Sequence, residues 1–236
     1  MVSRPWYNTD MSIHKDFVSS QDRYLEFFCD KAKRAPFVLL PGRSGGDSWR
    51  VMISAPHSVE QMRNSSIKFG EYDTGVLARL LYDELGCPVI YKTCNCNDDA
   101  NYDEVCGYKE TLKRFITEKG GGIRYLIDLH EMHPRRENLY DLGTGNGRNI
   151  EAGPEILEVV KGELEVRGFD HIAVDDIFDA GYRYTVSAFT ARECGISCLQ
   201  VEINSRLLCR EYDEYCFETV YLALRDAAIH LNGGNK

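Results

Sequence analysis

Three residues capable of metal or acid–base chemistry stand at or near the ends of short apolar segments: His57, His130 and Glu202. The segments are Trp49 to Ala55, Tyr125 to Leu129 and Ser197 to Ile203. Short apolar runs are typical of strands buried in an open α/β sheet, which binds its ligands at the carboxyl ends of the strands. If the three strands are neighbours, the two imidazoles and the carboxylate converge at one edge of the sheet.

Two histidines and one carboxylate are a common protein ligand set for catalytic zinc, and they leave a fourth position for water. Zinc held in this way lowers the pKa of its water to about 7 and polarises a carbonyl group. Hydrolysis of an amide also needs a carboxylate that takes the proton from water and passes it to the leaving amine. Glu202 suits this role, because a Glu inside an apolar strand is costly to bury without a partner.

The acidic zinc ligand has two candidates in the segment after His57. Glu60 follows His57 by three residues, a spacing that suits a tight turn. Glu71 stands at the start of the next expected helix, where the helix dipole stabilises an anion. The residue pattern alone leaves both open. His133 is left out of the ligand set, because on a strand exit a spacing of three from His130 need not converge on one ion.

These residues also have a purely structural interpretation. A histidine at a strand end is often a hydrogen-bonded turn residue, and Glu71 is also a favourable first-turn charge for a helix. Asp128 points away from its strand neighbours Ile127 and Leu129, so it either orients the His130 imidazole or caps a helix. The occurrence of similar residues at equivalent strand ends favours a site.

Arginines flank the expected strand ends and are suited to binding a substrate carboxylate, which Arg grips through two parallel hydrogen bonds. Arg206, four residues past Glu202, is the first candidate, and Arg136 is the second. The other arginines on these loops are Arg63, Arg135 and Arg183. We therefore expect the partner to be a small molecule or a short peptide.

The rest of the sequence alternates between strand and helix patterns. Further strands are expected at Phe37–Leu40, Pro88–Tyr91, Leu139–Leu142 and His171–Val174. Helices are expected at Tyr72–Leu85, Tyr102–Glu118, Pro154–Val166, Thr185–Cys194 and Tyr212–Leu231. This alternation predicts a three-layer α/β fold, in which helices flank a mixed, mostly parallel sheet. Residues 1–236 are expected to form a single zinc-hydrolase-like domain, with residues 1–34 as an N-terminal helical appendage.

Two local patterns refine this outline. Ser19-x-x-Asp22 resembles a capping box and predicts a helix in the appendage, followed by the basic run Lys31–Arg34. The glycine-rich segment Leu142–Gly147 matches neither GxGxxG nor a P-loop. We interpret it as a flexible loop at the rim of the site and not as a nucleotide-binding segment.

Charge and cysteine content restrict the partners and the compartment. With 28 Lys and Arg against 37 Asp and Glu, the net charge of −9 disfavours nucleic acid. No apolar run reaches the ~18 residues of a membrane span, and the first residues carry no signal-peptide pattern. The nine cysteines are odd in number and irregularly spaced, so we expect free thiols and a cytoplasmic location, with no membrane partner.

Several motifs, taken in order, resemble the N-formylglutamate amidohydrolase family. They are SAPHSV, Glu71-x-Asp73-Thr74-Gly75, IDLH, LGTG and LQVEIN-x-Arg206, and they span most of the chain. That family is similar in fold to zinc carboxypeptidases and succinylglutamate desuccinylases, so the resemblance implies a zinc carboxypeptidase-like, or phosphorylase/hydrolase-like, fold. The site residues that the resemblance implies are His57, His130 and Glu71 (rather than Glu60) for zinc, Glu202 as general base and Arg206 for substrate.

The chain departs from the family's motifs where the substrate would bind. It reads PHSVEQ in place of PHSG, and its DLH motif continues as Glu131-Met132-His133-Pro134. The sequence therefore predicts a zinc-dependent hydrolase of a small amide, such as an N-formyl or other N-acyl amino acid. A zinc peptidase acting on peptide or γ-glutamyl substrates is the alternative. A non-catalytic binding protein on the same fold is a third interpretation, which Glu202 disfavours because binding alone has no use for a buried base.

Overall fold

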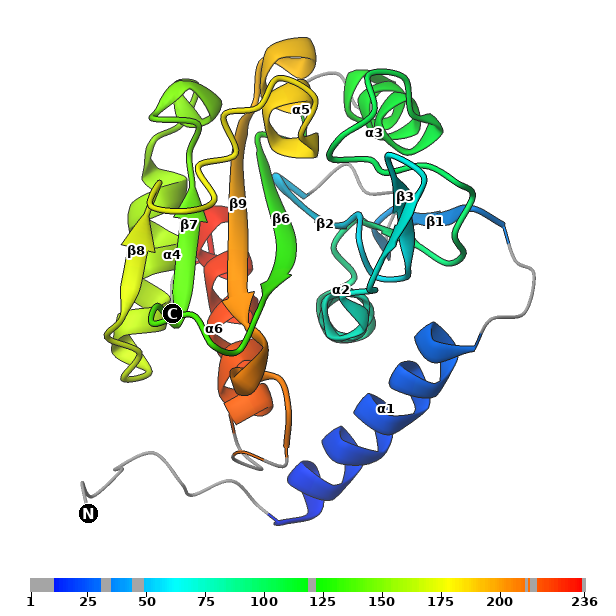
Figure 1. The fold of residues 1–236 in the computed structure, drawn as a ribbon. Helices are drawn as coiled ribbons and strands as arrows, with labels where there is room; N and C mark the ends of the chain where they lie inside the picture. The colour runs from blue at the N-terminus through cyan, green and yellow to red at the C-terminus, as the bar shows by residue number, and fades with distance from the viewer. Residues whose placement is uncertain are drawn as a thin grey trace.

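The computed structural model describes residues 11–30, 35–43, 49–118, 122–210, 212 and 216–234 (Figure 1). The strands are β1 (Phe37–Leu40), β2 (Val51–Ala55), β3 (Gln61–Arg63), β4 (Ser66–Lys68), β5 (Val89–Lys92), β6 (Tyr125–Met132), β7 (Tyr140–Gly143), β8 (Ile172–Val174) and β9 (Ser197–Asn204). The helices are α1 (Met11–Cys29), α2 (Tyr72–Leu85), α3 (Gly107–Glu118), α4 (Glu155–Val166), α5 (Val186–Cys194) and α6 (Cys216–Leu231). Most lie within a few residues of the ranges that the sequence predicts.

Seven strands form one sheet in the order β1-β5-β2-β6-β9-β7-β8, and β3 and β4 form a separate hairpin. The four central strands β5, β2, β6 and β9 are parallel. At the edges, β1 is antiparallel to β5, and β7 is antiparallel to β9 and parallel to β8. The expected α/β fold with a mixed, mostly parallel sheet is therefore confirmed.

Side-chain alternation along the strands creates a hydrophobic core on each face of the sheet. Ile53 and Ile127 point into the larger core, which they share with α2, α4 and α6. Met52 and Leu126 point the other way, into the core beneath α3 and α5. In Figure 1, α6 runs behind β9. The sheet is thus covered by helices on both faces, as the three-layer expectation requires.

The N-terminal helix α1 begins at Met11, earlier than the Ser19-x-x-Asp22 pattern predicts. Its Phe28 is only 3% exposed and belongs to the larger core. A Cβ at Gly75 of α2 would come within 2.6 Å of the Phe28 ring, so this approach of the two helices requires glycine. The basic run 31–34 lies outside the described residues, and the assignment of the whole chain to one domain stays a prediction.

The loop between β5 and α3 is longer than expected, because α3 begins at Gly107 and not at Tyr102. The preceding residues form a turn, in which the N–H groups of Tyr102 and Asp103 donate to the carbonyl oxygen of Asp99 at 3.0 and 2.9 Å. Near the other end of the chain, Tyr212 lies in a turn and not in a helix. The helix expectations were therefore too long at these two N-termini.

The segment after His57, expected to be a loop, contains the β3–β4 hairpin. Its turn residues Asn64 and Ser65 have φ values of 51° and 60°. Two successive left-handed residues are typical of tight hairpin turns, because their twist matches that of the strands. The hairpin brings Arg63 and Lys68 to the cavity described below. No helix in the described part of the chain is long and apolar enough to span a bilayer.

Candidate metal centre

The strands that carry the candidate residues are neighbours in the sheet, in the order β2-β6-β9. His57 follows β2, while His130 and Glu202 are paired directly in the parallel register of β6 and β9. Both have the alternation phase of Leu126 and Cys198, whose side chains belong to the core beneath α3 and α5. The two imidazoles and the carboxylate accordingly line one cavity at the carboxyl edge of the sheet.

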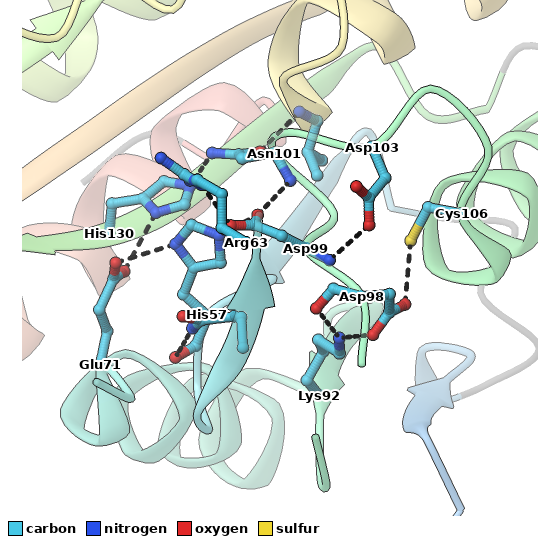
Figure 2. Close-up of polar contacts among 12 residues, drawn as sticks. His57, Arg63, Glu71, Lys92, Asp98, Asp99, Asn101, Asp103, Cys106 and His130 are labelled. Carbon is cyan, nitrogen blue, oxygen red and sulfur yellow. Dashed lines mark hydrogen bonds and ion pairs between the residues drawn. The ribbon is translucent and has the colours of Figure 1, made fainter. Parts of the chain in front are cut away.

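Two imidazoles and the Glu71 carboxylate form a compact group (Figure 2). Nδ1 of His57 lies 2.9 Å from Oε1 of Glu71, and Nδ1 of His130 lies 3.0 Å from Oε2. Their ligand atoms all lie within 4.8 Å of one another. Tetrahedral zinc with bonds near 2.0–2.1 Å separates its ligand atoms by about 3.3 Å, so the three residues fit a zinc ion. Glu60 is not part of this group.

The backbone holds Glu71 in this position from two sides. Its own N–H donates to the carbonyl oxygen of His57 at 2.8 Å. This hydrogen bond joins the two ends of the segment 57–71, which contains the hairpin. The N–H of Glu131 donates to Oε2 of Glu71 at 3.0 Å. Glu71 also precedes the first residue of α2, where the helix dipole favours an anion. The carboxylate is therefore placed by main-chain contacts rather than by side-chain packing alone.

Acidic side chains accept from the far nitrogens of both imidazoles. Nε2 of His57 lies 2.9 Å from Oδ1 of Asp99, whose Oδ2 accepts from Nε of Arg63 at 2.7 Å (Figure 2). Nε2 of His130 lies 3.5 Å from Oδ2 of Asp128 and 3.0 Å from Nδ2 of Asn101, the donor nitrogen of that amide. The Asp99 carboxylate fixes a proton on Nε2 of His57 and so leaves Nδ1 of that ring for a metal.

Sequence reasoning missed Asp99 as a part of the site. It lies in the polar loop after β5, a strand that pairs with β2. The available signal was its position: an acidic residue beyond the carboxyl end of a strand next to the one that carries His57. The alternative role considered for Asp128, orientation of His130, agrees with the contact between their side chains.

The charges of this group shift one another's proton affinities. Burial alone would lower the pKa of His57 and His130, but the Glu71 carboxylate and the bonds to Asp99 and Asp128 raise both. Burial alone would raise the pKa of Glu71, but the two imidazoles hold it at about 2. In the absence of a metal, the two imidazoles therefore keep their protons to a higher pH than free histidine side chains do, and these protons compete with a metal ion.

Glu202 is 6% exposed, and its side chain is oriented by its strand neighbour Gln200. Nε2 of Gln200 donates to Oε1 of Glu202 at 3.0 Å. Burial raises the pKa of Glu202 to about 7, with the nearby Glu71 carboxylate acting in the same direction. Within the described residues, Oε1 of Gln200 has no hydrogen-bond partner, although it is buried at the cavity wall. The carboxyl group is thus suited to exchange a proton near neutral pH.

The cavity has a volume of about 660 Å³, and of the two candidate substrate arginines only one lines it. Arg136 lines it, with its guanidinium carbon 5.7 Å from the ring centre of Phe178. Arg206 does not line it, and its Nη2 donates to the carbonyl oxygen of Glu137 at 3.3 Å. Arg63, from the hairpin, is a third arginine at the site, but Asp99 already holds it.

Part of the cavity wall is the segment 176–180, which is anchored by Asp141 of β7. Its fully buried carboxylate accepts from the N–H groups of Asp176, Ile177 and Phe178 at 3.2, 2.7 and 2.9 Å. The glycine-rich segment 142–147 packs behind this wall, where the N–H of Gly145 donates to Asp179. It does not line the cavity, so our interpretation of it as a flexible rim loop was wrong.

The fold is one that carboxypeptidase-like hydrolases share. The chain is 13% identical to a protein described as a carboxypeptidase from Burkholderia mallei, with a TM-score of 0.52 over 95% of this chain and 68% of that one. It aligns with N-formylglutamate amidohydrolase from Ralstonia eutropha at 15% identity and a TM-score of 0.52, covering 85% of this chain and 98% of that one. The predicted resemblance to that family is therefore confirmed at the level of the fold.

A bacteriophage poly-γ-glutamate hydrolase has the same fold, with 12% identity and a TM-score of 0.52 over 86% of this chain and 93% of that one. No protein-family model and no curated protein matches the sequence. At these identities the likeness concerns the fold, and the chemistry has to be argued from the residues of this chain.

Proposed function

We propose that the chain is a zinc-dependent hydrolase of a small amide, such as an N-formyl or other N-acyl amino acid. The observation that carries this proposal is the contact of Glu71 with both imidazoles, beside a buried Glu202 in the same cavity. A metal-binding group alone would also suit a structural site. A buried carboxylate that exchanges protons near neutral pH is what hydrolysis additionally requires.

In this proposal His57, Glu71 and His130 hold the zinc ion. When bound, the ion would act as a Lewis acid that polarises the amide carbonyl and lowers the pKa of water. Glu202 takes a proton from the attacking water and delivers it to the leaving nitrogen, while Gln200 keeps its carboxyl group oriented. We assign binding of the substrate carboxylate to Arg136. Arg206, the first candidate from the sequence, instead contacts the backbone at Glu137 from outside the cavity lining.

Metal content tests the ligand assignment. The purified chain offered zinc should retain about one ion, and His57→Ala, His130→Ala and Glu71→Ala should each lose it. Glu60→Ala is the matched control, because Glu60 follows His57 closely in sequence but is outside the ligand group. Elemental analysis after gel filtration measures the content. If the parent chain binds no zinc, or if the Glu60 variant loses it and the Glu71 variant does not, the assignment is wrong.

The raised pKa values of His57 and His130 make the effect of zinc dependent on pH. Protons on the imidazoles compete with zinc. The rise in melting temperature on adding zinc should therefore be larger at about pH 8 than at about pH 5.5. In the metal-free chain the sign is opposite. The stability from the protonated imidazoles is complete below the unfolded pKa of about 6.5 and is lost as pH rises through their higher folded values.

Thermal unfolding with and without zinc at the two pH values measures both effects. Glu71→Gln is a suitable comparison, since it removes the carboxylate that raises the imidazole pKa values. A zinc-induced shift of equal size at both pH values would contradict protonated imidazoles in the metal-free centre.

A second candidate function is hydrolysis of a peptide or γ-glutamyl chain. The size of the cavity favours it, because about 660 Å³ exceeds the space needed by a formyl group and one amino acid. Comparing turnover of an N-acyl amino acid with that of a γ-glutamyl oligomer of several residues separates the two candidates. Faster turnover per bond of the oligomer would assign the chain to the second class.

A further inference from the structure

The cavity beside the candidate metal centre is bordered by exposed apolar side chains. Within the described residues, eight large hydrophobic side chains are exposed, and three of them line this cavity. These are Phe69, Ile177 and Tyr182, which are 90%, 45% and 48% exposed. Single exposed hydrophobic residues are ordinary, but a group of them around a cavity is typical of a binding surface. We call Phe69, Tyr102, Ile177 and Tyr182 the apolar rim.

The aromatic part of the rim is held in place before any ligand binds. The rings of Tyr102 and Tyr182 stack, with centres 6.0 Å apart and planes inclined by 29°. Arg63 covers Tyr102 at 5.2 Å, and the Asn64 amide donates to the Tyr102 hydroxyl at 3.1 Å. Hairpin residues therefore fix a ring that in turn supports Tyr182. A preorganised aromatic surface binds a ligand with little loss of conformational freedom.

The same cavity offers positive charge together with this apolar surface. Arg136 and Lys68 both line it and both are exposed. Such a combination suits a ligand with a carboxylate and a separate apolar part. A formyl group has one carbon, which is too small to cover side chains as exposed as Phe69.

We propose that the substrate is a carboxylate-bearing amide with a large apolar group, best an aromatic ring, beside the scissile bond. Phe69, Ile177 and Tyr182 receive this group, and Arg136 binds the carboxylate. The proposal rests on the proposed amide hydrolysis. It goes further by selecting, among N-acyl amino acids, those with a bulky apolar acyl group or a bulky apolar side chain.

Binding tests the rim without requiring turnover. The zinc-loaded full chain is titrated calorimetrically with benzylsuccinate and with methylsuccinate, dicarboxylates that differ by a phenyl ring. Benzylsuccinate should bind about 10- to 100-fold more tightly, and Phe69→Ala and Tyr182→Ala should each remove most of this ratio. Val166→Ala, at an exposed residue of α4 that does not line the cavity, is the matched control and should keep the ratio.

Turnover then identifies the side of the amide that bears the ring. N-benzoyl-L-glutamate and N-formyl-L-phenylalanine each differ from N-formyl-L-glutamate on one side of the scissile bond. One of the two aromatic substrates should have a kcat/KM at least about 10-fold above that of N-formyl-L-glutamate. Tyr182→Ala should lower that value by a larger factor than it lowers the value for N-formyl-L-glutamate.

The outcomes separate this inference from the proposed function. Equal binding of the two succinates, or rim variants that weaken both equally, would overturn the rim assignment even in an active hydrolase. Ring-dependent binding with no hydrolysis of any of the three amides would count against the proposed function and leave the rim assignment standing. A dimer that dissociates in Tyr182→Ala, with succinate binding unchanged, would assign the rim to contacts between copies of the chain.

Discussion

Glu202→Gln is expected to lower kcat by about 10²- to 10⁴-fold while the zinc content of the chain stays unchanged. Gln has nearly the shape of Glu and keeps a partner for Gln200, but it cannot accept a proton. Glu202 is paired with His130 in the sheet register and is 6% exposed, so the change should leave the packing intact. Steady-state kinetics with the zinc-loaded variant, beside elemental analysis of the same sample, measures both quantities.

Glu158→Gln is a control for this substitution, since Glu158 is exposed on α4 and does not line the cavity. A Glu202→Gln variant that loses its zinc would make Glu202 a ligand and not a base. If Glu202→Gln is fully active, Glu202 is not the general base. If the parent chain binds N-acyl amino acids but never hydrolyses them, the interpretation as a binding protein replaces the enzyme.

Asp141→Ala is expected to lower the free energy of unfolding by about 3 kcal/mol or more, because three backbone N–H groups lose their shared acceptor. The loss of activity should exceed the loss of folded protein, since the segment that Asp141 anchors lines the cavity through Ile177 and Phe178. Asp141→Asn keeps one acceptor oxygen and should lie between the parent and the Ala variant. Chemical denaturation and kcat/KM at a temperature where all variants are folded measure the two effects.

Asp170→Ala provides the comparison, because Asp170 precedes β8 and its side chain is 81% exposed. It should change the free energy of unfolding by less than about 0.5 kcal/mol. An Asp141→Ala variant as stable as this control would show that the segment 176–180 holds its conformation without the carboxylate.

The grouping of His57, Glu71 and His130 as a candidate metal centre could be predicted because these residues lie on or next to regular elements. His130 and Glu202 are inside strands, where alternation determines the face, and His57 lies two residues past the end of a third strand of the same sheet. The order of the strands in the sheet could not be predicted, because sequence patterns do not show which strands are neighbours. The choice of Glu71 over Glu60 came from the family resemblance, and the contacts of Glu71 with both imidazoles agree with it.

The residues that sequence analysis missed belong to irregular segments. Asp99 contacts His57 across 42 positions of the chain, and a loop has no periodicity from which such a contact can be inferred. The strands β3 and β4 have three residues each, too few for alternation to be recognised. Arg206 was placed near Glu202 by sequence distance, but a 3₁₀ turn over Ser205–Leu207 follows β9 and carries it to the backbone at Glu137.

The proposed catalytic residues and the proposed substrate-binding rim lie on different kinds of segment. His130 and Glu202 are held by the central strands, whereas Phe69 follows the hairpin and Tyr182 precedes α5 without belonging to a strand. Insertions and replacements are tolerated far better in surface loops than in a central sheet. If the proposed amide hydrolysis holds, grafting a different hairpin or a different segment before α5 should redirect the chain to other amides while His130 and Glu202 keep their places in the sheet.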